Sequence, residues 1–204
     1  GVNLQTQTIT IIDNDNGAFN YVETFETVAD LDVAGFQAFI LPTQDLPATK
    51  LFKYNMNGGK YADVNDETQS SDTGLVVFYS NTQNGNGIID NVVITPQMAI
   101  SGAIDVSVDI AYSQAPQFNN ADITFYYSET YNGSGTWTDA DWTVMGTETA
   151  ASMETDGYAT NDYKRKVMSI NPASNFYVAV RVNQIIDDTF WKTQWRLDNF
   201  KVNN

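Results

Sequence analysis

The chain has 204 residues, with 25 acidic against 10 basic side chains, a formal net charge of -15, and neither cysteine nor histidine. Lacking these two residue types, it cannot form disulfide frameworks, thiolate or histidine zinc sites, cysteine nucleophiles or Ser-His-Asp triads. Its negative charge disfavours nucleic acid and anionic membranes as partners, whereas it suits calcium, which takes oxygen ligands.

The length favours one main domain, because all-β sandwiches of this size commonly form a single folding unit. No run of about 18 apolar residues occurs, so we expect no direct membrane insertion. Many Asn, Thr, Ser, Gly and Tyr residues, with only 17% charged residues, are typical of extracellular β-proteins. We therefore expect an exported protein at the extracellular or outer-membrane surface, its signal or lipid anchor lying outside this fragment.

Residues 1–17 hold one alternating stretch, "LQTQTITII", followed by the turn "DNDNG". The turn does not fit an EF-hand loop starting at Asp13, because Gly17 falls at position 5 and Thr24 at position 12. A solvated linker turn and another type of cation site both remain open. "TITIIDND" resembles the last strand of a Calx-beta or immunoglobulin-like domain, which implies the tail of a preceding domain. We expect an N-terminal strand or linker over 1–17 and the main domain over 18–204.

Strict alternation of apolar and polar residues is the strongest periodic signal in the rest of the chain. In "IDVSVDIAY", residues 104–112, every second side chain is apolar, as a half-buried strand requires. Clusters of Gly, Asn, Asp and Ser separate this stretch from others like it. The further predicted strands are 21–25, 36–40, 75–80, 91–95, 122–128, 142–146, 164–170, 176–183 and 190–202.

About ten short strands with little or no helix predict two antiparallel sheets packed face to face. The expected fold class is an all-β sandwich, specifically a jelly roll. Long loops are expected around residues 55–74 and 129–163, and because they exceed the usual connection length we expect binding residues there.

The last predicted strand, "FWKTQWRLDNFKV", changes its alternation at an Asp-Asn pair. Trp195 and Leu197 share one face, and Phe200 and Val202 continue on that face only if one residue is slipped. This slip predicts a β-bulge, which bends the strand and re-aims one side chain, either Asp198 or Asn199.

Seven pieces of sequence together resemble a known family: "YVETFETV", "IIDNVVITPQMAI", "IDVSVDIAYS", "ITFYYSE", "WTVMG", "FYVAVRV" and "WRLDNFKV". In this order, from about residue 20 to 202, they resemble the choice-of-anchor J domain. That jelly roll is related to the MAM and cleaved-adhesin modules of bacterial surface proteins. The resemblance implies that the first and last strands lie side by side.

The same resemblance implies that acidic residues on the first and last strands share a calcium ion. The residues carried over are Glu26 and Asp198, and Asp109 is a third candidate because it lies on the polar face of its strand. A bound Ca²⁺ would relieve the repulsion between such carboxylates. The alternative is that Asp198 caps a bulge amide or pairs with Arg196 or Lys201.

Aromatic residues in loops are candidates for stacking on sugar rings. Trp195 and Trp142 follow strand patterns and are expected to be core residues. The remaining candidates for glycan binding are Trp137, Trp191, Tyr131 and Tyr158, with Tyr131 and Tyr158 expected in one loop region. The alternative for each loop aromatic is a lid packed over the end of the sandwich.

These observations favour a non-catalytic cell-surface module that binds polysaccharide, with an optional structural calcium ion. The alternative is a protein-protein adhesion or spacer domain that positions other domains of the parent surface protein. A glycoside hydrolase is disfavoured, because carboxylates alone do not indicate a catalytic pair.

Overall fold

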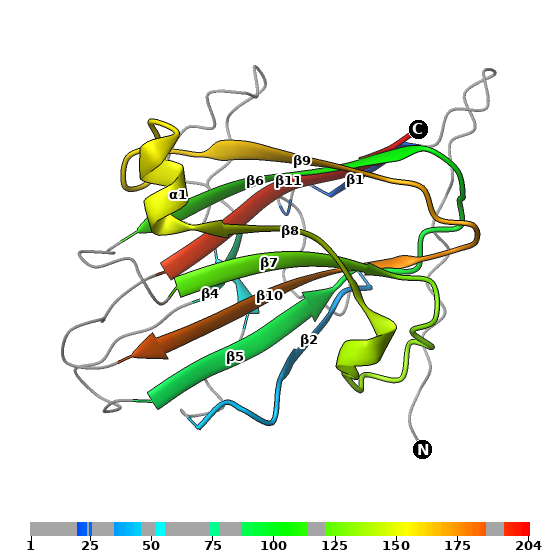
Figure 1. Ribbon diagram of the computed structural model, residues 1–204, viewed down its shortest axis with the longest axis horizontal. Helices are drawn as coiled ribbons and strands as arrows, with labels where there is room; N and C mark the ends of the chain where they lie inside the picture. Colours follow the sequence, from blue (N-terminus) through cyan, green and yellow to red (C-terminus); the bar gives the residue numbers. More distant parts are fainter. Residues whose placement is uncertain are drawn as a thin grey trace.

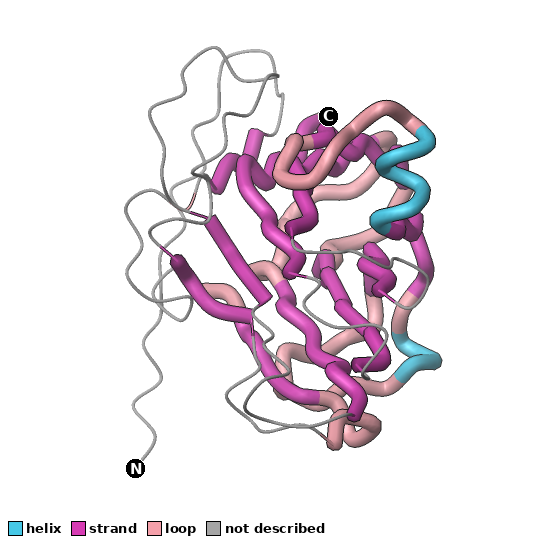
Figure 2. The backbone as a smooth tube through the Cα atoms, turned by 90° about the vertical axis from the view of Figure 1, so that its left-hand side faces the viewer, coloured by secondary structure: helices cyan, strands magenta, loops and turns pink. Residues whose placement is uncertain are grey.

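The computed structural model describes residues 20–23, 25, 35–45, 52–55, 74–77, 87–113, 121–186 and 194–204. Within these ranges the chain forms two antiparallel sheets packed face to face (Figure 1, Figure 2). This confirms the predicted all-β sandwich. The predicted segment 1–17 and its boundary with the main domain lie outside the described residues.

The six-stranded sheet has the order β3-β4-β11-β6-β9, with β1 also paired to β11. The five-stranded sheet has the order β2-β5-β10-β7-β8. In the first sheet the strands are β1 (Asn20–Glu23), β3 (Phe52–Asn55), β4 (Gly74–Val77), β6 (Ile104–Ser113), β9 (Lys164–Ile170) and β11 (Gln194–Asn203). In the second they are β2 (Gln37–Ile40), β5 (Gly87–Ile94), β7 (Ala121–Ser128), β8 (Thr143–Thr149) and β10 (Tyr177–Ile186).

The core lies between the two sheets and is built from alternate side chains of each strand. On β6, Val106 and Ile110 are fully buried, and they share one hydrophobic cluster with Val178 and Val182 of β10. Each such side chain contributes about 1.5–3 kcal/mol when it leaves water. The predicted alternation of residues 104–112 is therefore confirmed.

The predicted bulge in β11 is present. The pairing of β11 with β6 shifts between Asp198 and Lys201, and Asn199 has a φ of 47°. Because of this slip, the alternating apolar residues before and after the bulge all enter the same core: Trp195, Leu197, Phe200 and Val202.

One edge of β11 is shared by two strands, divided at the bulge. β4 pairs with Trp195–Leu197, and β1 pairs with the segment that begins at Phe200. The first and last described strands thus lie side by side, as the family resemblance implies.

Two short helices lie in the segment 129–163, where a long loop was expected around the predicted strand 142–146. Strand β8 confirms that strand, whereas the 3-10 helix η2 (Asp139–Asp141) and helix α1 (Ala150–Thr155) on either side of it were not predicted. A capping box starts α1, in which the side chains of Thr149 and Ser152 bond each other's backbone amides. No helix in the described ranges has the length and hydropathy to cross a bilayer.

Candidate functional site on the outer face of the five-stranded sheet

The register of the five-stranded sheet sets which side chains face away from the core. Val180 lies in the core, so its neighbours Ala179 and Arg181 point to the opposite side, here called the outer face. Cross-strand partners in an antiparallel pair share a face. Two adjacent rows therefore lie on the outer face: Phe39, Val92, Arg181, Thr124 and Thr147, and then Asp90, Asn183, Asp122 and Thr149.

The loop of residues 129–142 folds over one end of the outer face. Trp142 is 8% exposed, and Trp137 stacks on it with ring centroids 4.7 Å apart and planes 7° from parallel. Tyr126 of β7 meets Trp137 at 5.3 Å in an edge-on contact. Four rings of this cluster stay half-buried and form what we call the aromatic patch: Phe39, Tyr126, Trp137 and Tyr177.

Hydrogen bonds to β2 hold this loop in place. The Tyr131 hydroxyl donates to Gln37 Oε1 at 2.7 Å and accepts from the Gly135 amide at 2.8 Å. Gly133 has a φ of 76°, and a Cβ there would lie 3.1 Å from the Tyr177 hydroxyl. Glycine alone combines this backbone with so close an approach without strain, so a side chain at this position would disturb the contact of the loop with Tyr177.

Arg181 is the polar centre of the outer face. Its Nε and Nη2 donate to the two carboxylate oxygens of Asp90, each at 2.7 Å, and its Nη1 lies 3.4 Å from Asp139 Oδ1. These bonds to Asp90 raise the pKa of Arg181. The guanidinium carbon is 5.6 Å from the Trp137 ring centre, in cation-π range. Arg181 thus links the aromatic patch to the polar rows.

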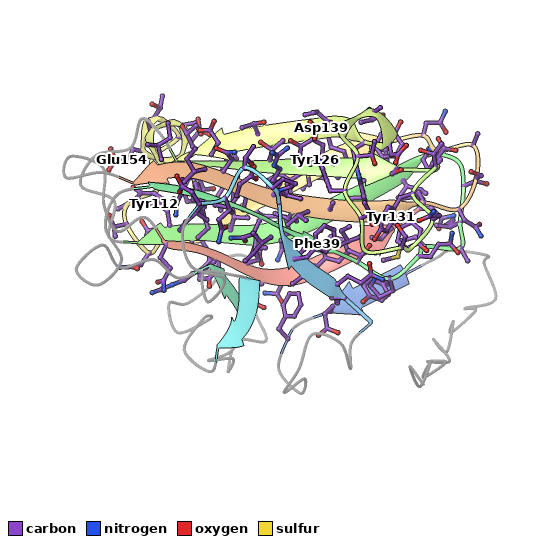
Figure 3. The ribbon with its side chains drawn as sticks, turned by 90° about the horizontal axis from the view of Figure 1, so that it is seen from below. Phe39, Tyr112, Tyr126, Tyr131, Asp139 and Glu154 are labelled. Atoms are coloured by element: carbon purple, nitrogen blue, oxygen red, sulfur yellow. The ribbon has the colours of Figure 1, made fainter. Side chains whose placement is uncertain are left out.

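The predicted glycan-binding residues do not form one group. Trp137 lies on the outer face, whereas Tyr131 is only 4% exposed and packs beneath the aromatic patch. The prediction that Tyr158 shares a loop region with Tyr131 is wrong, because β8 and α1 separate them. The Tyr158 carbonyl accepts from the Tyr112 hydroxyl, and Figure 3 shows Tyr112 at the opposite end of the sandwich from Tyr131. Trp191 lies outside the described residues.

The residues that the strands contribute to the site were not predicted from the sequence. Phe39 lies on β2 and Tyr126 on β7, whereas binding residues were expected in loops. Arg181 offered the one usable signal, since it is the only basic residue in the alternating stretch "FYVAVRVN".

The predicted metal residues are partly placed. Asp109 of β6 and Asp198 of β11 are direct cross-strand partners, 0% and 3% exposed. Arg165 donates to both oxygens of Asp109, at 2.7 and 2.6 Å. Asp198 Oδ1 accepts from the Asn199 amide at 2.7 Å, which is the bulge-capping role that the sequence left open. Glu26 lies outside the described residues, and within them no group of three acidic residues has metal-binding geometry.

Solved structures that are similar to this chain identify its fold. No family model and no curated protein matches the chain. The K1 cleaved adhesin domain of Lys-gingipain from Porphyromonas gingivalis superposes with a TM-score of 0.59 at 16% identity, over 90% of this chain and 96% of that one. The K2 cleaved adhesin domain of Lys-gingipain gives 0.55 at 15% identity, over 90% and 98%.

A more distant structure, a carbohydrate-binding module in complex with β-1,4-galactotriose, gives a TM-score of 0.48 at 8% identity, over 88% of this chain and 97% of that one. This overlap is too low to argue from. The two adhesin domains show that this chain has a cleaved-adhesin-like jelly roll. Assignment to the choice-of-anchor J family stays a prediction.

Proposed function

We propose that this chain is a non-catalytic module that binds polysaccharide on the outer face of the five-stranded sheet. The observation that carries the proposal is the juxtaposition of half-buried rings with hydroxyl, amide and guanidinium groups. Tyr126 and Trp137 border Arg181 and Thr124, and Asn183 is exposed in the next row. Aromatic rings pack against the C–H faces of sugars, while polar side chains bond the hydroxyls.

The proposed site lies mainly on the sheet, whereas the sequence predicted binding residues in the loops. The loop contributes Trp137, and the strands contribute Phe39, Tyr126 and Arg181. A non-catalytic role is supported by Asp90, because a carboxylate already bonded to Arg181 through both oxygens is poorly suited to protonate a glycosidic bond. We further propose an extracellular location, with other domains of the parent protein holding the module at the cell surface.

The test is isothermal titration with soluble polysaccharides and their oligosaccharides, first screened by affinity gels. Trp137→Ala and Tyr126→Ala should each weaken binding by about 0.5–1.5 kcal/mol, the contribution of an aromatic contact beyond its buried area. Val167→Ala is the matched control, because Val167 is 54% exposed on the other sheet. Retardation by no polysaccharide would favour the adhesion or spacer role instead.

We also propose a structural calcium ion near Glu26, Asp109 and Asp198. The pairing of Asp109 with Asp198 supports it, although Arg165 already balances the charge of Asp109. A calcium titration followed by thermal melting tests it: the midpoint should rise with calcium in the wild type and not in Asp198→Asn. An unchanged wild-type midpoint would remove the ion from the proposal.

A further inference from the structure

We infer that the outer face selects uncharged glycans and rejects polymers of uronic acids. The inference rests on the proposed function and names the ligand class that the charges of the site allow. It starts from Arg181, the only basic side chain that the described residues place on this face.

The positive charge of Arg181 is already balanced. Asp90, fully buried, takes both of its parallel N–H donors, and Asp139 lies beside the third nitrogen. The Asp139 side chain is 81% exposed, so its charge faces an incoming ligand. A carboxylate ligand therefore finds no unpaired cation among the described residues of the outer face. It also meets the exposed carboxylate of Asp139, which lies beside Arg181.

A second exposed carboxylate lies close by. Asp122 is the cross-strand partner of Asn183, which is two residues from Arg181 on β10. Asp122 is exposed and forms no ion pair with any described residue. Diagonal neighbours in a sheet are about 7–8 Å apart, within about one Debye length at physiological salt. Around Arg181, the described residues thus set one cation against three carboxylates, Asp90, Asp139 and Asp122, a local net charge of -2.

The hydrogen-bonding groups of the outer face also favour uncharged glycans. Arg181 Nη1 and Asp139 Oδ1 form a donor and an acceptor 3.4 Å apart. A sugar hydroxyl can satisfy both groups at once, because it accepts and donates. An ionised carboxylate only accepts, so it cannot donate to Asp139, whose Oδ1 also accepts from Trp137 Nε1, and the two negative charges repel each other. The pair is therefore complementary to neutral hydroxyl groups.

Matched glycan pairs that differ only at C6 test this inference. The probes are cello-hexaose, mannohexaose and β-1,4-galactohexaose, each compared with its own C6-oxidised uronate form by titration calorimetry at 20 and 500 mM NaCl. Where a neutral oligosaccharide binds, its oxidised form should bind at least about tenfold more weakly at 20 mM NaCl. This difference in affinity should become smaller at 500 mM NaCl, because salt screens the repulsion between the charges.

Charge-neutralising variants distinguish the effect of charges on the outer face from the effect of the net charge of the protein. Asp139→Asn and Asp122→Asn should each reduce severalfold the difference in affinity between the neutral glycan and its oxidised form. Asp105→Asn should leave this difference in affinity unchanged. It alters the net charge of the protein by the same amount, but Asp105 lies on the six-stranded sheet. Equal binding of both members of a pair, or preference for the oxidised one, would overturn the inference and leave the proposed function standing. Binding of no neutral or oxidised member would contradict the proposed function itself.

Discussion

Arg181 of β10 holds Asp90 of β5 through two parallel hydrogen bonds of 2.7 Å, and Asp90 is fully buried although it lies on the outer face of a sheet. Thr43 and Gln44, which follow β2, complete the cover by donating to the Asp90 carboxylate and accepting from its amide. A buried carboxylate in this position depends on its one cationic partner.

Arg181→Ala should therefore lower the free energy of unfolding by about 3 kcal/mol, since it leaves the Asp90 charge buried and unpaired. Arg181→Lys should lower it less, because a lysine keeps the charge but not the bidentate geometry. Urea unfolding measures both. The double change Asp90→Asn with Arg181→Ala should cost less than Arg181→Ala alone, and a larger cost would contradict this reasoning.

Trp142 allows a second test, because it is buried without a partner for its indole N–H among the described residues. Trp142→Phe removes that unsatisfied donor and keeps a ring beneath Trp137, so it should cost about 1 kcal/mol or less. Trp142→Ala should cost about 3–5 kcal/mol, because it leaves a large void under the stacked ring. Thermal and urea melting would show the contrast. A loss well above 1 kcal/mol in Trp142→Phe would mean that the indole N–H is bonded and would contradict the prediction.

The bulge in β11 gives a third prediction. Asn199 has a left-handed backbone, and its Nδ2 donates to Asp109 Oδ2 at 3.1 Å. Asn199→Ala should lose about 2 kcal/mol, from backbone strain and the lost bond together. Asn199→Gly should lose about 1 kcal/mol less, because glycine adopts this backbone freely. The difference between the two urea midpoints is the readout, and a more stable alanine variant would contradict the assigned conformation.

Much of the fold was predictable because burial follows a period of two along each strand. β9 begins and ends at the predicted residues, Lys164 and Ile170, and Met168 and Ile170, two residues apart, pack into or against the core. β3 was missed, because the alternation of Phe52 and Tyr54 with Lys53 and Asn55 extends over only four residues. The six residues of α1 are too few to show a helical period, so its existence depends on the cap at Thr149.

The site was less predictable because its contacts join distant parts of the sequence. Tyr131 is buried through a hydrogen bond to Gln37, 94 residues earlier, and no local pattern indicates that contact. Trp142 was expected in the core between the sheets, but the structure places it in the separate cluster on the outer face. Strand registers decide such positions, and a single sequence does not reveal them.

The final prediction concerns Glu148, which joins the edges of the two sheets. Its carboxylate on β8 accepts from Lys164 Nζ at 2.9 Å, Lys166 Nζ at 2.5 Å and Ser152 Oγ at 2.6 Å. Burial alone would raise the pKa of Glu148, but the bonds from Lys166, Ser152 and Lys164 together lower it below its ordinary value of 4.5. The folded protein therefore holds this proton less tightly than the unfolded chain does.

The stability that Glu148 contributes should be fully present above pH 4.5 and should be lost as the pH falls through the lowered pKa. Glu148→Gln should be less stable than the wild type at pH 7, and the gap should shrink in acid. Urea midpoints measured between pH 7 and pH 3 would show this, and Lys166→Met should weaken the acid dependence because it removes one of the bonds that lower the pKa. Parallel pH profiles of wild type and Glu148→Gln would mean that the ion pairs between β8 and β9 do not stabilise the folded state.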